Sequence, residues 1–133
     1  MISIIYVEYN ASHPNDFIFE TAADQQYWLI LLTRTPAMFL VDGQMREYPA
    51  NCAVILPPKF KILYGACTDT YVNDWLRFDS TEPLFTEPNS PPIGIPFPVP
   101  DPDYLHKIFQ LLAPENFLQN DFKELNVYHL LQL

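Results

Sequence analysis

The sequence predicts a mainly β domain followed by two C-terminal α-helices. In the first 80 positions, short runs rich in β-branched and aromatic residues recur at a spacing of about 8 to 12 residues, with turn formers between them. This pattern is typical of an all-β sandwich or barrel. Helical periodicity is absent until residue 101. With 133 residues, 49% of them hydrophobic, the chain is long enough for one domain with a single core.

Composition excludes several classes of function. The formal net charge of −9 lacks the basic footprint of a nucleic-acid binder, so we expect no direct contact of these residues with DNA or RNA. The N-terminus lacks the pattern of a signal peptide, and no apolar stretch is long enough to span a membrane. We therefore expect a cytoplasmic protein without membrane contact. Cys52 and Cys67 lack zinc-ligand spacing and are expected as free thiols, although a disulfide stays open.

The first strands are separated by clear turn signals. Residues 2–9 and 16–21 are β-rich runs on either side of the turn-forming segment NASHPN. Two later runs flank Asp42-Gly43, a pair that favours the type I′ turn of a β-hairpin because both positions need positive φ. Asn51 is expected in another tight turn, since asparagine tolerates the left-handed region.

A double proline ends one strand and is followed by further β-type runs. Pro57 and Pro58 cannot donate ladder hydrogen bonds, so the run VIL before them ends there. In the next strong run, TYVNDWLRFD, alternation places four residues on one face: Tyr71, Asn73, Trp75 and Arg77. Rings, an amide and a guanidinium together suit a small polar ligand. An exposed sheet face with Trp75 half-buried is the open alternative.

The C-terminal third begins with a proline-rich segment, 82–102, in which apolar residues alternate from Ile93 to Val99. This pattern predicts a last strand along an edge of the β body. Asp101 is a suitable N-cap and Pro102 a suitable first residue for a helix. The stripe that would pack on the body consists of Leu105, Ile108, Phe109 and Leu112.

A second helix is expected to start near Asp121, with Glu124 completing a capping-box variant. Its apolar residues point almost all round the axis, and a helix of this kind is buried on every side. A small body covers only one face, so the other face is expected to form a homodimer seam; a plain internal core helix stays open. The seam residues are Leu125, Val127, Tyr128 and Leu131.

Neither a metal site nor a catalytic residue is predicted. The histidines are His13, expected in a turn, and His106 and His129 on the two helices, and none shares a strand with another. His106 is expected to be a solvated surface residue. No nucleophile motif or phosphate loop occurs, and the chain has only three glycines. Nothing favours paired-carboxylate catalysis, which stays open.

The order of these segments resembles the N-terminal effector-binding and dimerisation domain of AraC-type transcription regulators. The resemblance runs from about residue 16 to the end. It rests on five segments in order, followed by the two expected helices; the segments are QYWLILLTR, VDG, REY, ANCAVILPPKFKILY and YVNDWLRFD. The family's domain is a cupin-like jelly-roll barrel, or double-stranded β-helix, followed by two helices. Ile62 and Arg77 stand where the family carries histidines, and Ser80 where it carries glycine.

This resemblance implies a barrel that binds a small effector, often a sugar. Tyr64, Asn73 and Trp75 align with ligand-contacting positions of the family, and Glu20 falls near an arginine contact. Because that change replaces a donor by an acceptor, it argues against an arabinose-type sugar. The second helix would be the dimer seam. Regulators of this family contact DNA through a basic domain after the second helix, so we expect that domain beyond Leu133.

The leading hypothesis is therefore a non-enzymatic sensor without metal or other cofactor. Residues 1–100 would form the barrel with an N-terminal arm, the candidate moving part, and residues 101–133 the two-helix dimerisation segment. The effector would lie against Tyr64, Asn73 and Trp75, with Tyr71 and Arg77 nearby. Two alternatives stay open: a stand-alone cupin enzyme acting on a sugar or small metabolite, and a structural dimerisation module whose barrel is packed solid.

Overall fold

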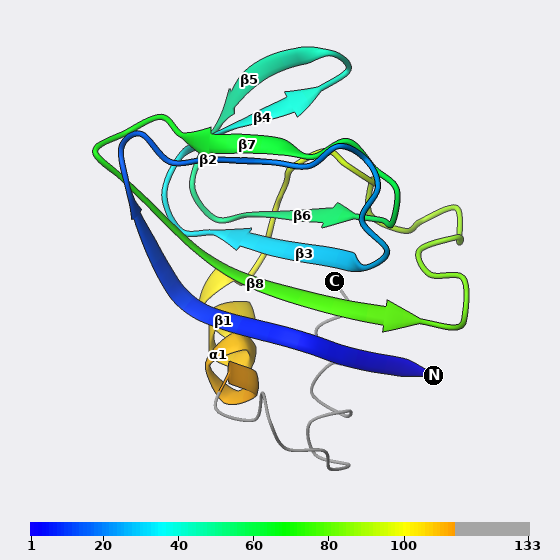
Figure 1. The fold of residues 1–133 in the computed structure, drawn as a ribbon. Coiled ribbons are helices and arrows are strands. Elements are labelled where there is room, and N and C mark those ends of the chain that lie inside the picture. The colour runs from blue at the N-terminus through cyan, green and yellow to red at the C-terminus, as the bar shows by residue number, and fades with distance from the viewer. Residues whose placement is uncertain (114–133) are drawn as a thin grey trace.

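In the computed structural model, residues 1–113 are described, and they form nine strands and one helix (Figure 1). The strands are β1 (Ile2–Pro14), β2 (Ile18–Glu20), β3 (Trp28–Thr33), β4 (Ala37–Val41), β5 (Gln44–Tyr48), β6 (Cys52–Leu56), β7 (Leu63–Ala66), β8 (Thr70–Ser80) and β9 (Phe97–Pro98). The helix is α1 (Pro102–Leu112). Its length and composition do not allow it to cross a membrane.

The strands form two antiparallel sheets with jelly-roll topology. Sheet A has the order β1-β8-β3-β6-β9, and sheet B has the order β2-β7-β4-β5. Strands pair in a nested manner, β4 with β5, β3 with β6, β2 with β7 and β1 with β8. This is the rolled arrangement of an eight-stranded jelly roll, to which β9 adds an edge strand on β6. The predicted mainly β jelly-roll fold is thus confirmed. The double proline lies between β6 and β7, where the chain crosses from sheet A to sheet B.

Local turn chemistry behaves as the sequence predicts. Asp42 and Gly43 join β4 to β5 with φ of 52° and 77°, as a type I′ hairpin requires. Asn51 precedes β6 with φ of 66°. The protruding β4–β5 hairpin, which Asp42 and Gly43 close, is seen at the top of Figure 1.

The central strands of sheet A, β3 and β6, are buried on both faces. One face packs on sheet B around a core made of Leu29, Leu31, Ala37, Phe39, Val41, Val54, Leu56, Ile62, Tyr64 and Tyr71. Alternate residues of the same strands face α1, in a second core with Ile2, Val7, Ile30, Leu32, Ile55, Leu76, Phe78, Leu105, Ile108, Phe109 and Leu112. The side-chain period of two therefore sends neighbouring residues of one strand into different cores.

Helix α1 follows the prediction closely. Asp101 caps it by accepting a hydrogen bond from the Tyr104 backbone N–H at 3.1 Å, and Pro102 is its first residue. The four buried residues of the helix are the predicted stripe, Leu105, Ile108, Phe109 and Leu112. The predicted second helix, with its seam residues, lies outside the described residues.

Two expectations about the edges of the body are corrected. The first 14 residues were expected as an arm with its own turn, but residues 2–14 form one strand paired along β8. The turn formers are accommodated because Asn10 adopts a φ of 58° at a register shift, which bends the strand without ending it. In the proline-rich segment only Phe97–Pro98 pairs with β6, since proline cannot donate to a ladder.

Candidate ligand-binding cavity

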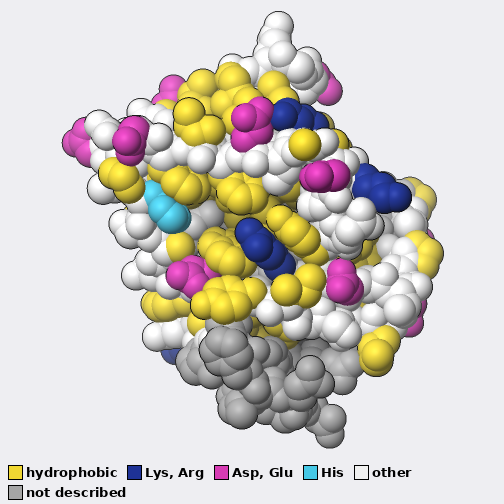
Figure 2. All heavy atoms as spheres, viewed as in Figure 1, with side chains coloured by type: hydrophobic (Ala, Val, Ile, Leu, Met, Phe, Trp, Pro, Cys, Tyr) yellow, Lys and Arg dark blue, Asp and Glu magenta, His cyan; other side chains and the backbone are white. Residues whose placement is uncertain are grey.

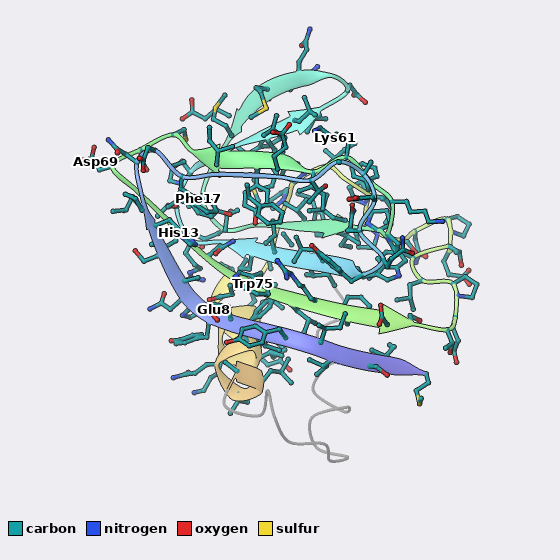
Figure 3. The ribbon with its side chains drawn as sticks, in the orientation of Figure 1. Glu8, His13, Phe17, Lys61, Asp69 and Trp75 are labelled. Atoms are coloured by element: carbon teal, nitrogen blue, oxygen red, sulfur yellow. The ribbon has the colours of Figure 1, made fainter. Side chains whose placement is uncertain are left out.

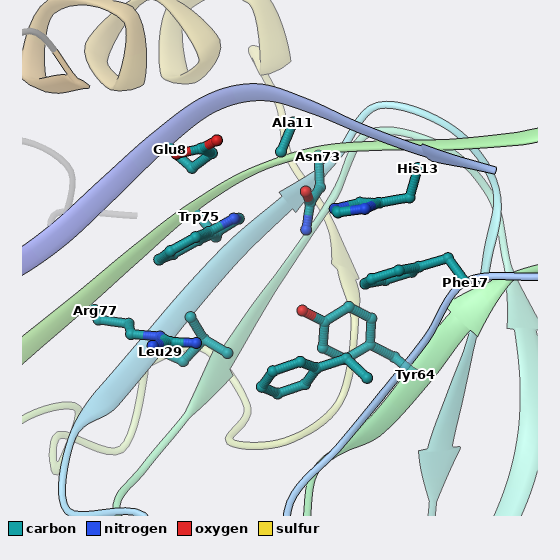
Figure 4. A pocket seen from close by; sticks show the side chains of 10 residues that line it. Glu8, Ala11, His13, Phe17, Leu29, Tyr64, Asn73, Trp75 and Arg77 are labelled. Atoms are coloured by element: carbon teal, nitrogen blue, oxygen red, sulfur yellow. The ribbon is translucent and has the colours of Figure 1, made fainter.

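A cavity of about 180 Å³ lies inside the jelly roll, beneath β1 and β8 and next to β2 and β7 (Figure 4). The residues that line it are Glu8, Ala11, His13, Phe17, Phe19, Leu29, Tyr64, Asn73, Trp75 and Arg77. Ligand cavities for drug-sized molecules hold roughly 300 Å³ or more, so this one suits a smaller molecule.

Strand β8 supplies three of the residues that line the cavity. Alternation turns Asn73, Trp75 and Arg77 towards it, while Leu76 and Phe78 belong to the core beneath α1. Tyr64 reaches the same cavity from β7 in the opposite sheet. The structure thus brings together four of the residues singled out in the sequence.

Arg77 is held between two aromatic rings. Its Cζ lies 4.8 Å from the centroid of the Tyr27 ring and 5.0 Å from that of Trp75. Within residues 1–113 the guanidinium forms no salt bridge, and its buried Nε has no hydrogen-bond partner. Cation–π contacts hold the group in place and leave its hydrogen-bond donors unused.

Asn73 joins the polar groups at the floor of the cavity. Its Nδ2 donates to the Tyr71 hydroxyl at 3.0 Å, and its buried Oδ1 has no partner among the described residues. Burial raises the pKa of the Tyr64 hydroxyl, against the opposing effect of the Arg77 charge, and burial also raises the pKa of Tyr71. Both hydroxyls therefore stay protonated at neutral pH, and the Tyr64 hydroxyl is available to a ligand as a donor.

Aromatic rings form the wall opposite β8. Phe17 stacks on His13 at a centroid distance of 4.0 Å and on Tyr71 at 5.2 Å. Phe19 lies 5.3 Å from the Tyr64 ring. Figure 2 shows this face of the molecule, with hydrophobic side chains around a central Lys or Arg side chain and an Asp or Glu close by. The cavity is therefore mainly apolar, with a few convergent polar groups.

Sequence reasoning missed the contribution of β1. Glu8, Ala11 and His13 line the cavity from this strand, and Figure 3 shows Glu8 and His13 along it, near Trp75 and Phe17. His13 was expected in a turn, but it pairs with Tyr71 in the ladder. Alternation along β1 breaks at the register shift between Glu8 and Ala11, which hides the shared face. Asn10, which tolerates positive φ, was the available signal for a bulge.

Two of the predicted ligand-binding residues lie elsewhere: Glu20, taken from the resemblance, and Tyr71, taken from the alternation along its strand. Glu20, at the end of β2, is exposed and forms a salt bridge of 2.7 Å with the Nζ of Lys61. Tyr71 is fully buried and does not line the cavity, but it contacts two residues that do, Asn73 by a hydrogen bond and Phe17 by ring stacking. The exposed partner Lys61 draws the Glu20 carboxylate outward, so the structure does not bring it into the cavity.

The other face of β8 carries a buried polar contact to α1. Asp74 Oδ1 accepts from the Asn10 backbone N–H at 2.8 Å, and its Oδ2 lies 2.5 Å from the Nδ1 of His106. Burial raises the pKa of Asp74, partly offset by these two contacts. The expectation of a solvated His106 was wrong, because the buried carboxyl of Asp74 and the Tyr9 ring at 4.6 Å hold it against the sheet.

Within residues 1–113, no three His, Cys, Asp or Glu side chains come together in a group that could hold a metal ion. Cys52 and Cys67, both in this part of the chain, are free thiols.

Comparison with known proteins finds likenesses among solved structures. No family model matches the chain, and no curated protein matches it. A de novo designed double-stranded β-helix, solved by solution NMR, aligns with 12% identity over 55% of this chain and 97% of its own, with a TM-score of 0.41. A Cupin 2 conserved barrel domain protein from Salinispora arenicola CNS-205 aligns with 20% identity over 59% of this chain and 60% of its own, with a TM-score of 0.38.

Proposed function

We propose that this chain binds a small effector in the cavity and serves as the ligand-sensing, dimerising part of an AraC-type transcription regulator. The observation that carries the binding role is the cavity itself, in which Trp75 offers a ring face and Arg77 and Asn73 offer polar atoms without partners. The assignment to AraC-type regulators rests on the sequence resemblance. In this proposal the chain performs no catalysis, and DNA contact belongs to a separate C-terminal domain of the full-length regulator.

Strand β8 offers a route from effector to helix. Asn73 and Trp75 face the cavity, and Asp74, between them in sequence, contacts His106 of α1 and Asn10 of β1. A ligand that moves β8 or the bulge of β1 therefore also moves the contact with α1. Binding would favour one arrangement of the C-terminal segment by the difference between the ligand's affinities for the two arrangements.

Dimerisation is the second part of the proposal. It rests on the apolar pattern of residues 121–133, whose seam positions Leu125, Val127, Tyr128 and Leu131 lie outside the described residues. A homodimer would cover the face that the small β body leaves uncovered. Sedimentation velocity at several protein concentrations, with and without a bound effector, measures this directly; a monomer at all concentrations would contradict it.

The test of effector binding is a thermal-shift titration of the 133-residue chain with sugars, polyols, carboxylates, amines and amino acids. A compound that binds only the folded chain raises the midpoint of unfolding, and the midpoint keeps rising with the logarithm of its concentration above the dissociation constant. Trp75→Ala should abolish the shift, whereas Tyr104→Ala, at an exposed position on α1, should leave it unchanged. If the full-length protein responds to one of these compounds and the isolated chain shows no shift, the cavity is not the sensor.

A stand-alone enzyme acting on a sugar or small metabolite is the second candidate. One observation favours it: Glu8 and His13, two groups able to exchange protons, line the same cavity as the Tyr64 hydroxyl. Turnover of a bound compound, lost in His13→Gln while binding persists, would support this role. Binding without turnover supports the sensor.

A further inference from the structure

We propose that the effector is a small zwitterion, a molecule with a carboxylate and an ammonium group joined by a short aliphatic stem. This inference rests on the proposed function, that the cavity binds a ligand, and it names the chemical class of that ligand. It is carried by two opposite, unpaired charges that line one small cavity at separate places, with a tryptophan ring between them.

The two charges are Arg77 and Glu8. Both side chains line the cavity, and among residues 1–113 neither has a salt bridge or a side-chain hydrogen bond. Other charged side chains are paired, such as Lys61 with Glu20 and Arg34 with Asp103. A half-buried charge without a partner is costly, and a ligand of opposite charge removes that cost.

The ladder register explains why the two groups do not neutralise each other. Glu8 lies opposite Trp75, and Arg77 is two residues further along β8, opposite Tyr6. Glu8 and Arg77 are thus diagonal neighbours on one face, at a Cα separation of about 7 to 8 Å. In Figure 4 the Trp75 ring lies between the Glu8 carboxylate and the Arg77 guanidinium. Arg77 is further held by its contacts with Tyr27 and Trp75.

This arrangement fits a zwitterion better than a neutral polyol. The unused guanidinium donors of Arg77 suit a carboxylate, which accepts from them in a planar pair. The Glu8 carboxylate suits an ammonium group, and the stem between the two groups would lie against Trp75 and Leu29, both in the cavity wall. A neutral sugar would displace water from Arg77 and Glu8 without bringing an opposite charge to either. Its affinity would therefore be lower than that of a zwitterion.

The separation of the charges also predicts the length of the stem. In glycine the two charged groups are attached to the same carbon, which is too short to reach from Arg77 past the Trp75 ring to Glu8. We therefore expect affinity to rise from glycine through β-alanine to γ-aminobutyrate. The apolar wall gives each added methylene a small further gain.

Isothermal titration of the 133-residue chain, in a buffer free of zwitterions, tests the inference with matched probes. Butyrate lacks the amine of γ-aminobutyrate, n-butylamine lacks its carboxylate, and arabinose is a neutral polyol. We expect γ-aminobutyrate to bind at least about tenfold more tightly than either truncated probe. Equal affinity for butyrate and γ-aminobutyrate would overturn the role of Glu8.

Two variants separate the two charges. Arg77→Gln should weaken γ-aminobutyrate and butyrate alike, whereas Glu8→Gln should remove the advantage of γ-aminobutyrate over butyrate. Arg46→Gln and Glu87→Gln change exposed charges elsewhere and should alter neither affinity. Circular dichroism checks that each variant is folded. If Arg77→Gln does not fold, the test of the zwitterion rests on the affinities of Glu8→Gln for γ-aminobutyrate and butyrate.

The outcomes distinguish this inference from the proposed function. If sugars or polyols bind, with loss in Trp75→Ala, and no zwitterion does, the cavity is a ligand site but the zwitterion assignment is overturned. If no compound of the whole panel binds, the ligand-binding function itself is rejected, and the zwitterion with it.

Discussion

The Oδ2 of Asp74 lies 2.5 Å from the Nδ1 of His106, and this contact joins the strand that lines the cavity to the helix that follows the barrel. Asp74 is fully buried, and its Oδ1 also accepts from the backbone of β1 at Asn10. One carboxyl therefore connects β8, β1 and α1. Its neighbours in sequence, Asn73 and Trp75, face the cavity.

We expect Asp74→Ala to lower the free energy of unfolding by about 2 to 3 kcal/mol, because the Asn10 N–H and the His106 ring lose their partner in a buried place. Urea denaturation measures the change. Asp79→Ala, at an exposed position of the same strand, is the matched control and should stay within about 0.5 kcal/mol of wild type. Equal losses in the two variants would contradict the structural role of this carboxyl.

The pH dependence of stability should report the same group. Burial raises the pKa of Asp74 above its ordinary value of 3.8, so just above that pH the folded protein binds more protons than the unfolded chain. Ionisation of Asp74 then costs stability as pH rises through the raised pKa. The difference in free energy of unfolding between wild type and Asp74→Asn should therefore decrease with rising pH. A difference that grows with pH would show a lowered pKa instead.

Two adjacent leucines test the packing of α1 on sheet A. Leu112 is fully buried in the core beneath the helix, whereas Leu111 is 46% exposed. Leu112→Ala should cost about 2 to 5 kcal/mol of stability, and Leu111→Ala at most about 0.5 kcal/mol. Chemical denaturation of both variants measures the two losses of stability. Similar losses would contradict the packing of α1 on sheet A through Leu112.

Gly65 sets the distance between β2 and β7. A Cβ at this position would lie 2.5 Å from the carbonyl oxygen of Phe17, which accepts a hydrogen bond from the Ala66 N–H. Because backbone cannot move aside easily, Gly65→Ala should cost about 1 to 3 kcal/mol and displace Phe17 from the cavity wall, which weakens ligand binding.

Gly43→Ala is the control for Gly65→Ala. Gly43 has a φ of +77° but no atom within 4 Å of an added Cβ. Its variant should lose about 1 kcal/mol from backbone strain and keep its ligand affinity. A loss of affinity in Gly43→Ala would point to a general effect of destabilisation.

The features that the sequence predicts well are those set by near neighbours in the chain. The hairpin at Asp42-Gly43, the cap at Asp101 and the buried stripe of α1 depend on residues a few positions apart. The face of β8 that carries Asn73, Trp75 and Arg77 follows from alternation alone.

The features that the sequence did not reveal depend on distant partners. His13 reaches the cavity and His106 meets Asp74 only because β1 and α1 pack against β8. The bulge at Asn10 reverses the expected alternation in the middle of β1, and no neighbouring residue predicts the register that results. Glu20 is turned away from the cavity by Lys61, a residue 41 positions later.

The nested pairing of the strands has a consequence for the order of folding. The β4–β5 hairpin closes a short loop, whereas β1 must find partners from Pro14 with Thr70 to Ile2 with Ser80. Contacts between distant residues form slowly because loop closure must precede them. We expect substitutions in the hairpin to change the refolding rate and those in β1 to change mainly the unfolding rate. The wall that carries Glu8 and His13 would then be the last to arrive, so a newly made chain acquires its binding site only at the end of folding.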